Sequence, residues 1–445
     1  MANILRGIAS FRPLVLLLAA PVGAATYTVT TTFDAGPGSL RAAITNANVH
    51  EGADLIRFSI PGAGVHTIRL LTDLPALEDA VTIDGYTQPG SRPNTSEFGS
   101  NAVITVELSG ENAPGGAKGL TISHKGCVLR GLVINRFREA TTGSGGGVAI
   151  LSSGNGEVIA GNFIGTDVSG TIALGNTEGI RLFGNTSRVG GTAPADRNIV
   201  SGNENAVGIR IEGDTNTVFG NLIGTDASGL EPLANNGAGV FVEGGASHFV
   251  GGTAPGSGNV VAFNGNGGVS TAPGASAAIL GNSVFDNFPS RGIGGIDVGY
   301  DGLSPNDACD ADAGEKNRQN FPVITSAVSS GGAVDVAFTL ESAPNQHYRI
   351  EFFASPACDD SGYGQGRFYL GAVDVATAGC SVSATAHLEG CLRGDFVVTA
   401  TATSPAGSTS EFSACRVLES GPNPECSRRI VPVVPAPAVP VHSRG

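Results

Sequence analysis

The stretch that decides the fold is Gly161–Gly170, Gly-Asn-Phe-Ile-Gly-Thr-Asp-Val-Ser-Gly. It returns at Gly220–Gly229 as Gly-Asn-Leu-Ile-Gly-Thr-Asp-Ala-Ser-Gly. A second motif, Val-Gly-Gly-Thr-Ala-Pro, occurs at 189–194 and again at 250–255. Both motifs recur after about 60 residues, and recurrence at a fixed spacing indicates a solenoid in which similar coils stack on one another.

Each repeat in the sequence contains three short apolar runs. The first run follows a glycine in every coil, at Gly147, Gly179, Gly208, Gly239 and Gly268. Three strands per turn, stacked in parallel about 4.8 Å apart, predict an all-β, right-handed parallel β-helix of the pectin-lyase-like kind. Alternation along the first run sets the inward residues. They are Ile180, Leu182, Ile209, Ile211, Val240 and Val242.

The third run of each coil begins with an asparagine: Asn162, Asn198, Asn221, Asn259 and Asn282. Asparagines that stack at a corner can adopt left-handed backbone conformations and form side-chain ladders along the axis. We therefore expect this column to be structural.

Composition and charge restrict the function. The 445-residue chain has 39 Asp and Glu against 25 Lys and Arg, for a net charge of −14, and it contains 67 glycines. An acidic surface repels nucleic acid and anionic lipid. Residues 1–25 read as a signal peptide, with Arg6 and Arg12 before the apolar run Leu14–Ala20, so we expect an exported protein, secreted or at the cell surface. No apolar run is long enough to span a membrane.

The remaining pattern divides the chain. Residues 26–305 are predicted to form the β-helix with an N-terminal strand and helix as a cap, with Ser39 as helix N-cap. Residues 306–320 read as an acidic linker, 321–418 as an immunoglobulin-like β-sandwich and 419–445 as an extended Pro-rich tail. Six of the seven cysteines lie in the last third, where export favours disulfides whose pairing stays open. Cys127 stands alone in an apolar run and should be a buried thiol.

Three segments resemble a known family. Gly-Ser-Leu-Arg-Ala-Ala-Ile (Gly38–Ile44), Thr-Ile-Asp-Gly-Tyr-Thr-Gln-Pro-Gly (Thr82–Gly90) and the Asn-x-Ile-Gly-Thr-Asp repeats are similar to those of bacterial exported right-handed parallel β-helix proteins with a CSLREAI-type N-terminal segment. The leading Cys of that signature is not present here. The resemblance implies the fold, export and a C-terminal immunoglobulin-like module. It implies no reaction, because such proteins are mostly known as surface or secreted repeats.

Asp167 and Asp226 are the candidate catalytic residues. They should lie at one corner, two coils apart, which places their anchors about 10 Å apart, near the upper limit for the paired carboxylates of inverting glycosidases. The other interpretation is an Asx-turn, which suits an Asp that follows Gly-Thr and precedes x-Ser-Gly. No zinc-protease, nucleophile-elbow or P-loop motif occurs in the sequence.

The outward face of the first strands carries the candidate ligand-binding residues. Arg181, Arg210 and Phe241 should form one column and Phe183, Glu212 and Glu243 the next. Like charges about 5 Å apart repel unless carboxylates or a bound anion compensate them. The pattern therefore predicts either a solvated face in which the two glutamates compensate the arginines, or a groove for a sugar polymer in which arginines bind hydroxyls or carboxylates and phenylalanines pack on sugar rings.

The acidic linker is the candidate metal site. Asp307, Asp310 and Asp312 precede a turn glycine, and carboxylate oxygens are the ligands that Ca²⁺ prefers. A merely solvated linker is the alternative, because the full twelve-residue loop pattern is absent.

The sequence as a whole predicts a secreted or surface-exposed, monomeric protein that binds extracellular polysaccharide or another cell-surface component, with Ca²⁺ as the candidate metal. One alternative is a polysaccharide lyase, hydrolase or epimerase that acts on acidic glycans, and another is a structural spacer. Whether the chain is an enzyme stays open at this point.

Overall fold

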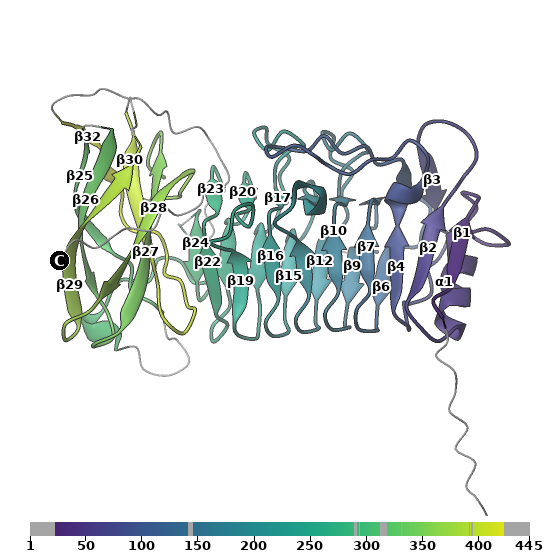
Figure 1. Cartoon of the computed structure of the whole chain (residues 1–445), viewed down its shortest axis with the longest axis horizontal. Coiled ribbons are helices and arrows are strands. Elements are labelled where there is room, and N and C mark those ends of the chain that lie inside the picture. The colour runs from purple at the N-terminus through teal and green to yellow at the C-terminus, as the bar shows by residue number, and fades with distance from the viewer. Residues whose placement is uncertain are drawn as a thin grey trace, which may run out of the picture.

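The computed structural model describes residues 23–140, 146–288, 292, 294–311, 318–330, 332–390, 392 and 395–421. It shows an elongated parallel β-helix with a pair of further sheets at its C-terminal end (Figure 1). Nearly all of the predicted signal peptide and of the predicted tail lies outside the described residues. Within the described residues, no helix is long and apolar enough to cross a membrane.

In the described part of the chain, three parallel sheets of nine, eight and seven strands run along the β-helix, because most coils contribute one strand to each sheet. Sheet A consists, in spatial order, of β1 (Thr26–Val29), β2 (Asp54–Phe58), β4 (Val81–Asp84), β7 (Val128–Arg130), β10 (Val158–Ala160), β13 (Arg188–Gly190), β16 (Thr217–Phe219), β19 (His248–Gly251) and β22 (Ala277–Leu280). Sheet B consists of β3 (His66–Arg69), β5 (Val106–Ser109), β8 (Val133–Asn135), β11 (Phe163–Ile164), β14 (Ile199–Val200), β17 (Leu222–Ile223), β20 (Val260–Ala262) and β23 (Ser283–Phe285). Sheet C consists of β6 (Leu120–Ile122), β9 (Val148–Ser152), β12 (Glu178–Leu182), β15 (Ile209–Ile211), β18 (Val240–Val242), β21 (Val269–Thr271) and β24 (Ile296–Val298). Short 3-10 helices occur at η1 (Gly85–Thr87), η2 (Pro194–Asp196) and η3 (Ala308–Asp310).

The N-terminal end is closed by α1 (Leu40–Val49), as the sequence predicts (Figure 1). Ser39 is the N-cap, and its side-chain oxygen accepts a hydrogen bond from the backbone N–H of Ala42. Leu40 and Ile44 are buried against the first coils, so the helix covers core that would otherwise face water.

The core of the β-helix is one continuous apolar cluster that runs through all the coils. The six inward residues predicted for sheet C have no exposed surface. They pair in register, for example Ile180 with Ile209 and Ile209 with Val240. The alternating pattern and the repeat spacing therefore predict the coil correctly.

Two asparagine ladders line the corners on either side of sheet B. The first is the predicted one: Asn162, Asn198, Asn221, Asn259 and Asn282, each side-chain N–H donating to the next side-chain oxygen at 2.9 to 3.2 Å. The second, which the repeat spacing did not reveal, consists of Asn176, Asn203, Asn235, Asn264 and Asn287. The expectation of left-handed asparagines is wrong, because the glycines before three of them, Gly161, Gly220 and Gly281, take the positive φ instead.

The C-terminal module, residues 321–421, packs two four-stranded sheets on a core of its own. One sheet contains β29 (Ser381–Glu389), β26 (Ala333–Glu341), β25 (Val323–Ser330) and β32 (Glu419–Ser420). The other contains β28 (Phe368–Ala376), β27 (His347–Ser355), β30 (Val397–Thr403) and β31 (Arg416–Val417). The rings of Phe338 and Phe352 meet between the sheets at 5.3 Å, so the module is a sandwich. Its immunoglobulin-like character stays a prediction.

Two disulfides form among the described cysteines. Cys309 pairs with Cys380 and Cys358 with Cys415, whereas Cys127 is a buried free thiol, as expected. The first bridge joins the segment predicted as a linker to the module. Cys391 and Cys426 lie outside the described residues.

The module is docked on the last coil of the β-helix. Val284 of β23 and Gly366 exchange two backbone hydrogen bonds of 2.8 and 2.7 Å. Phe353 and Phe412 of the module belong to the core cluster of the β-helix. The second asparagine ladder also ends in the module, where the side-chain oxygen of Gln365 accepts the last hydrogen bond from Asn287 at 3.2 Å. The two parts thus share core and hydrogen bonds.

Candidate functional site

The predicted ligand-binding residues meet on the outer surface of sheet C. Cα pairing aligns Arg181 with Arg210 and Arg210 with Phe241 on β12, β15 and β18. The predicted column therefore exists. The residues of this surface, called the arginine face below, are Glu178, Arg181, Phe183, Arg210, Glu212, Phe241 and Glu243.

Glu178 is the member that the sequence analysis missed. It begins β12, is only 4% exposed, and accepts a hydrogen bond from Nε of Arg210 at 2.6 Å. Its other oxygen lies 3.9 Å from Nη1 of Arg181. One buried carboxylate thus lies between two stacked guanidinium groups and offsets their repulsion. The signal available in the sequence was an acidic residue directly before the coil-starting Gly179.

The two predicted glutamates compensate the arginines from the outside. Nε of Arg181 donates to Glu212 at 2.8 Å, and Nη1 of Arg210 donates to Glu243 at 2.5 Å. The side chains of both arginines are about one quarter exposed or less. The prediction of internal compensation is therefore confirmed. The guanidinium groups are held in fixed orientations while part of each still faces water.

Aromatic rings support both guanidinium groups. Cζ of Arg181 lies 4.8 Å from the ring centre of Phe183, and Cζ of Arg210 lies 5.6 Å from that of Phe241. Tyr300 packs on Phe241 at 5.1 Å, whereas Phe183 remains 43% exposed. Stacking of a guanidinium on a ring contributes about 0.5–1 kcal/mol at exposed sites. The face therefore presents a flat apolar surface with fixed donors and acceptors beside it.

Burial sets the protonation behaviour of the face. Desolvation raises the pKa of Glu178 above its ordinary value, and Arg210 and Arg181 offset only part of that rise. Burial lowers the pKa of Arg210, but its ion pairs with Glu178 and Glu243 outweigh this, so its pKa is raised. Glu178 is thus a buried carboxylate whose proton affinity the fold increases.

Asp167 and Asp226 lie in the two Gly-Thr-Asp loops, 165–174 and 224–233, which leave sheet B after β11 and β17. One oxygen of Asp167 accepts from the hydroxyl of Ser169 and from the backbone N–H of Thr171 and Ile172. Asp226 accepts from the hydroxyl and the backbone N–H of Ser228 and from the backbone N–H of Glu231. The Asx-turn bond, from the backbone N–H two residues on, is thus present at Asp226, whereas the backbone donors to Asp167 lie four and five residues on. The loops touch through Ala227 N–H and Gly170 O at 2.9 Å.

The predicted metal ligands are only partly described. Asp310 accepts hydrogen bonds from the backbone of Asn320 at 2.9 Å and the hydroxyl of Ser342 at 2.9 Å. The backbone N–H and carbonyl groups of Asp307 form hydrogen bonds with the side chain of Asn320. Asp312 is outside the described residues. No cluster of three metal-binding side chains occurs among the described residues. The linker site therefore stays a prediction.

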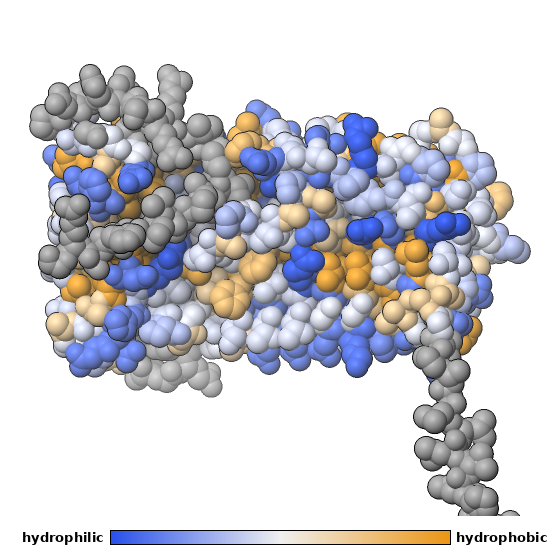
Figure 2. All heavy atoms as spheres, viewed as in Figure 1, coloured by the Kyte–Doolittle hydropathy of each residue, from blue (hydrophilic) through white to orange (hydrophobic). Residues whose placement is uncertain are grey.

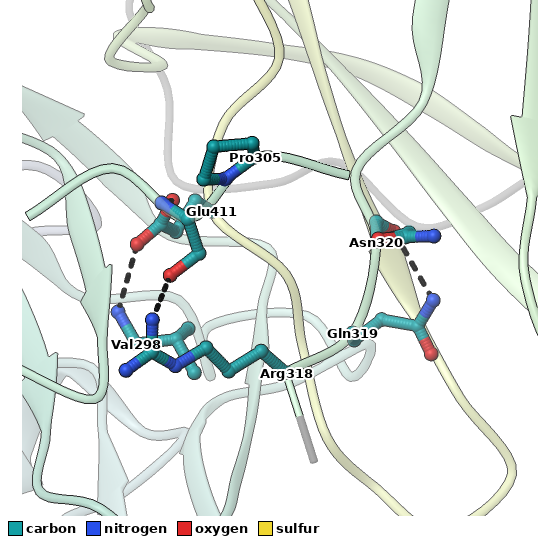
Figure 3. A pocket seen from close by; sticks show the side chains of 7 residues that line it. Val298, Pro305, Arg318, Gln319, Asn320 and Glu411 are labelled. Carbon is teal, nitrogen blue, oxygen red and sulfur yellow. Dashed lines mark hydrogen bonds between the residues drawn. The ribbon is translucent and has the colours of Figure 1, made fainter. Parts of the chain in front are cut away.

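A polar cavity of about 180 Å³ lies where the β-helix meets the module (Figure 3). Glu411 reaches it from the module and accepts hydrogen bonds from the backbone N–H groups of Val298 and Ser304, at 3.2 and 2.9 Å. Arg318 lines it from the segment before β25 and donates to Ser304 and Asp301. Desolvation is the main cause that raises the pKa of Glu411 to about 8. The cavity is part of the junction, and no sequence pattern pointed to it.

The side of the molecule in Figure 2 alternates strongly hydrophilic residues with hydrophobic patches. The fold and the site together define an elongated parallel β-helix protein with a prearranged polar and aromatic surface on one sheet.

No protein-family model and no curated protein matches this chain. Among solved structures, it is similar to the tailspike protein gp49 of Acinetobacter baumannii bacteriophage Fri1, a capsular polysaccharide depolymerase. The identity is 10%, the match covers 88% of this chain and 85% of that chain, and the TM-score is 0.25. Full-length tailspike protein 2 from Escherichia coli O157:H7 bacteriophage CAB120 matches at 11% identity, with 85% of this chain and 60% of that chain covered and a TM-score of 0.20. Similarities at this level carry no argument about function.

Proposed function

We propose that this chain is an exported protein that binds extracellular polysaccharide along the arginine face. The observation that carries the proposal is Glu178, which is buried between Arg181 and Arg210 and fixes their orientation before any ligand arrives. Groups that are already oriented lose little side-chain entropy on binding. The predicted signal peptide and the two disulfides support an extracellular location.

The charges of the face favour a neutral polymer rich in hydroxyl groups. Three carboxylates, Glu178, Glu212 and Glu243, face two guanidinium groups, so the surface carries a net negative charge when all are ionised. A uronate would have to displace Glu212 or Glu243 from its arginine. A hydroxyl group can instead accept from a guanidinium and donate to a carboxylate without breaking either pair.

Affinity electrophoresis on gels that contain neutral or uronate polysaccharides tests the proposal. Phe183→Ala removes the exposed ring of the face and should weaken binding by about 1 kcal/mol, or roughly fivefold. Arg181→Gln with Arg210→Gln removes both fixed donors and should abolish measurable retardation. Phe33→Ala is the matched control, because Phe33 is 73% exposed and lies outside the arginine face.

Two results would contradict the proposal. Retardation that survives the double arginine variant would show that another surface binds the polymer. Retardation by uronate polymers alone would contradict the preference for neutral chains. Circular dichroism of each variant shows whether a loss of binding reflects a loss of fold.

An enzyme of the lyase, hydrolase or epimerase class is the second candidate. The observation that favours it is the raised pKa of Glu178, which is buried between Arg181 and Arg210, because a carboxyl group with a raised pKa can serve as a general acid. Incubation of the protein with polysaccharides, followed by assays for new reducing or unsaturated ends, tests this. Product formation that Glu178→Gln abolishes would establish that the chain is an enzyme. Binding without product formation would instead support the proposed binding protein.

A further inference from the structure

A ribbon of apolar side chains runs along the outside of sheet B. The outward residues of β8, β11, β14, β17 and β20 lie in register along the axis. They are Val133, Phe163, Ile199, Leu222 and Val260. A row of apolar side chains on the solvent side of a sheet needs a cover, because each exposed one forgoes about 1.5–3 kcal/mol of burial.

Two kinds of segment cover most of this ribbon. Residues 92–103, called the strap below, run along the β-helix from β4 to the Gly-Thr-Asp loops (Figure 1). The strap is fixed there by a hydrogen bond from the Asn94 side chain to Pro194 O at 2.9 Å, and by another from Ser100 N–H to Ala227 O at 2.6 Å. Val168 and Ala227 of the loops pack on the ribbon beside it.

The strap and the loops end before the module begins, and a cavity of about 130 Å³ lies in the uncovered part of the ribbon. Leu222, Val260 and Phe285 are among the residues that line it. Phe98 of the strap and Leu230 of the second Gly-Thr-Asp loop also line it, and these two side chains are 50% and 53% exposed. A cavity of similar size lined by aliphatic and aromatic side chains is known to hold one benzene ring. The volume therefore suits a single six-membered ring.

Two arginines line the same cavity. Arg197 is 5% exposed and donates to the carbonyl oxygens of Ser96, Glu97 and Gly220. These carbonyl groups accept its hydrogen bonds but do not neutralise its positive charge. Within the described part of the chain, no carboxylate forms an ion pair with Arg197. Burial accordingly lowers the pKa of Arg197.

Arg367 closes the cavity from the module. Its Cζ lies 4.3 Å from the ring centre of Phe285, and its nearest carboxylate is Asp286 at 3.6 Å. Asp286 is 58% exposed at its side chain, so water screens much of this pair. The apolar cavity therefore has an excess of positive charge at its polar edge, in a chain whose net charge is −14.

We infer that this cavity is a binding site for a small carboxylate with an apolar ring, such as an aromatic or alicyclic monocarboxylic acid. The ring occupies the space among Leu222, Val260 and Phe285, and the carboxylate faces the guanidinium group of Arg367. The site is separate from the arginine face: it lies on sheet B, and its ligand is an apolar anion rather than a hydroxyl-rich polymer.

Ligand-observed NMR titrations of the full chain test the inference with three probes: benzoate, the neutral isostere benzamide, and glucuronate. Benzoate should bind saturably and benzamide about tenfold more weakly, because a hydrogen bond to a charged partner contributes more than one to a neutral partner. Arg367→Met keeps the apolar stem over Phe285 and should weaken benzoate about tenfold, with little change for benzamide.

A second variant avoids any effect on the interface between the β-helix and the module. Leu230→Asp places a carboxylate at the exposed rim and should weaken benzoate by repulsion while the protein stays folded. The matched controls are Arg416→Met, an exposed arginine elsewhere on the module, and Ile172→Asp, a 58% exposed residue of the other Gly-Thr-Asp loop. Both controls should bind benzoate like the parent protein.

Each remaining outcome overturns the inference. Equal affinity for benzoate and benzamide would remove the role of the positive charge. Tighter binding of glucuronate than of benzoate would show that the cavity prefers a sugar to an apolar ring. Absence of saturable benzoate binding to the parent protein would show that the cavity is not a binding site for such acids. Unchanged benzoate affinity in both Arg367→Met and Leu230→Asp would place any binding elsewhere.

Discussion

The interior of the β-helix and its junction with the module bury polar groups in two different ways. Along the β-helix the buried side chains at the corners are amides, and each one repeats the bonds of the previous coil. At the junction they are acids: Glu351 accepts from Gly281 N–H at 2.7 Å, and Glu411 accepts from Val298 and Ser304. Amides do not titrate and acids do. The contribution of the amide ladders to stability should therefore be independent of pH, whereas the contribution of the acids at the junction should depend on it.

The largest effect is expected from breaking a ladder in its middle. Asn221→Ala removes an oxygen that accepts from Asn198 and an N–H group that donates to Val189 O and Asn259. Several buried groups then lose partners, so the free energy of unfolding should fall by about 3 kcal/mol. Chemical denaturation measures it, with exposed Asn112→Ala as a control that should change stability by less than about 0.5 kcal/mol. A similar small effect for Asn221→Ala would show that the ladder contributes little.

A smaller, pH-dependent effect is expected at the junction. The pKa of Glu411 is raised from an ordinary 4.5 to about 8, so between these values the folded chain holds a proton that the unfolded chain releases. Stability from this group is fully present below pH 4.5 and is lost as the pH rises through 8. Asp297 and Arg318 are the charged groups that act on it most closely.

Glu411→Gln should flatten that profile. The parent protein should lose on the order of 2 kcal/mol more than the variant between pH 5 and pH 9. Thermal unfolding at several pH values measures the difference, with exposed Glu51→Gln as the control. Part of the slope should persist in the variant, because desolvation also raises the pKa of Glu351. Parallel profiles for parent and variant would mean that Glu411 is ionised throughout.

The smallest effect is expected at the exposed acids of the repeats. Asp226→Ala removes an acceptor that three donors of its own loop use, and it should cost about 1 kcal/mol. Asp226→Asn keeps most of these bonds and should be nearly neutral, and polysaccharide binding should not change in either variant. Loss of a glycan-cleaving activity in Asp226→Asn would restore Asp167 and Asp226 as an acid/base pair.

Most of the fold follows from local, repeated signals in the sequence. Alternation in runs such as Gly179–Leu182 identifies the inward residues, and Ser39 identifies the start of α1. The second ladder could also have been predicted, because four of its members each precede a coil-starting glycine by a few residues. They are Asn176, Asn203, Asn235 and Asn264. Their uneven spacing hid them.

The rest of the site depends on contacts that no repeat encodes. Glu178 stands in a segment with the residue types of a loop, and only the register of β12 with β15 brings it to Arg210. Gln365, Arg367 and Glu411 come from a module without repeats, so their partners on the β-helix follow from docking alone. Sequence reasoning predicted the column of Arg181, Arg210 and Phe241 and the compensation by Glu212 and Glu243. It could not predict these tertiary contacts.

The meeting of Asn287 with Gln365 also bears on how far such a molecule could grow. Each coil presents the next with open strand edges and an unfilled amide, which is an addition site for one more identical unit. Gln365 and the Val284–Gly366 backbone pair occupy that site with a segment that cannot repeat the pattern. In the language of polymer chemistry the module is the terminator, and without it the last coil would be a growing end able to add a second chain.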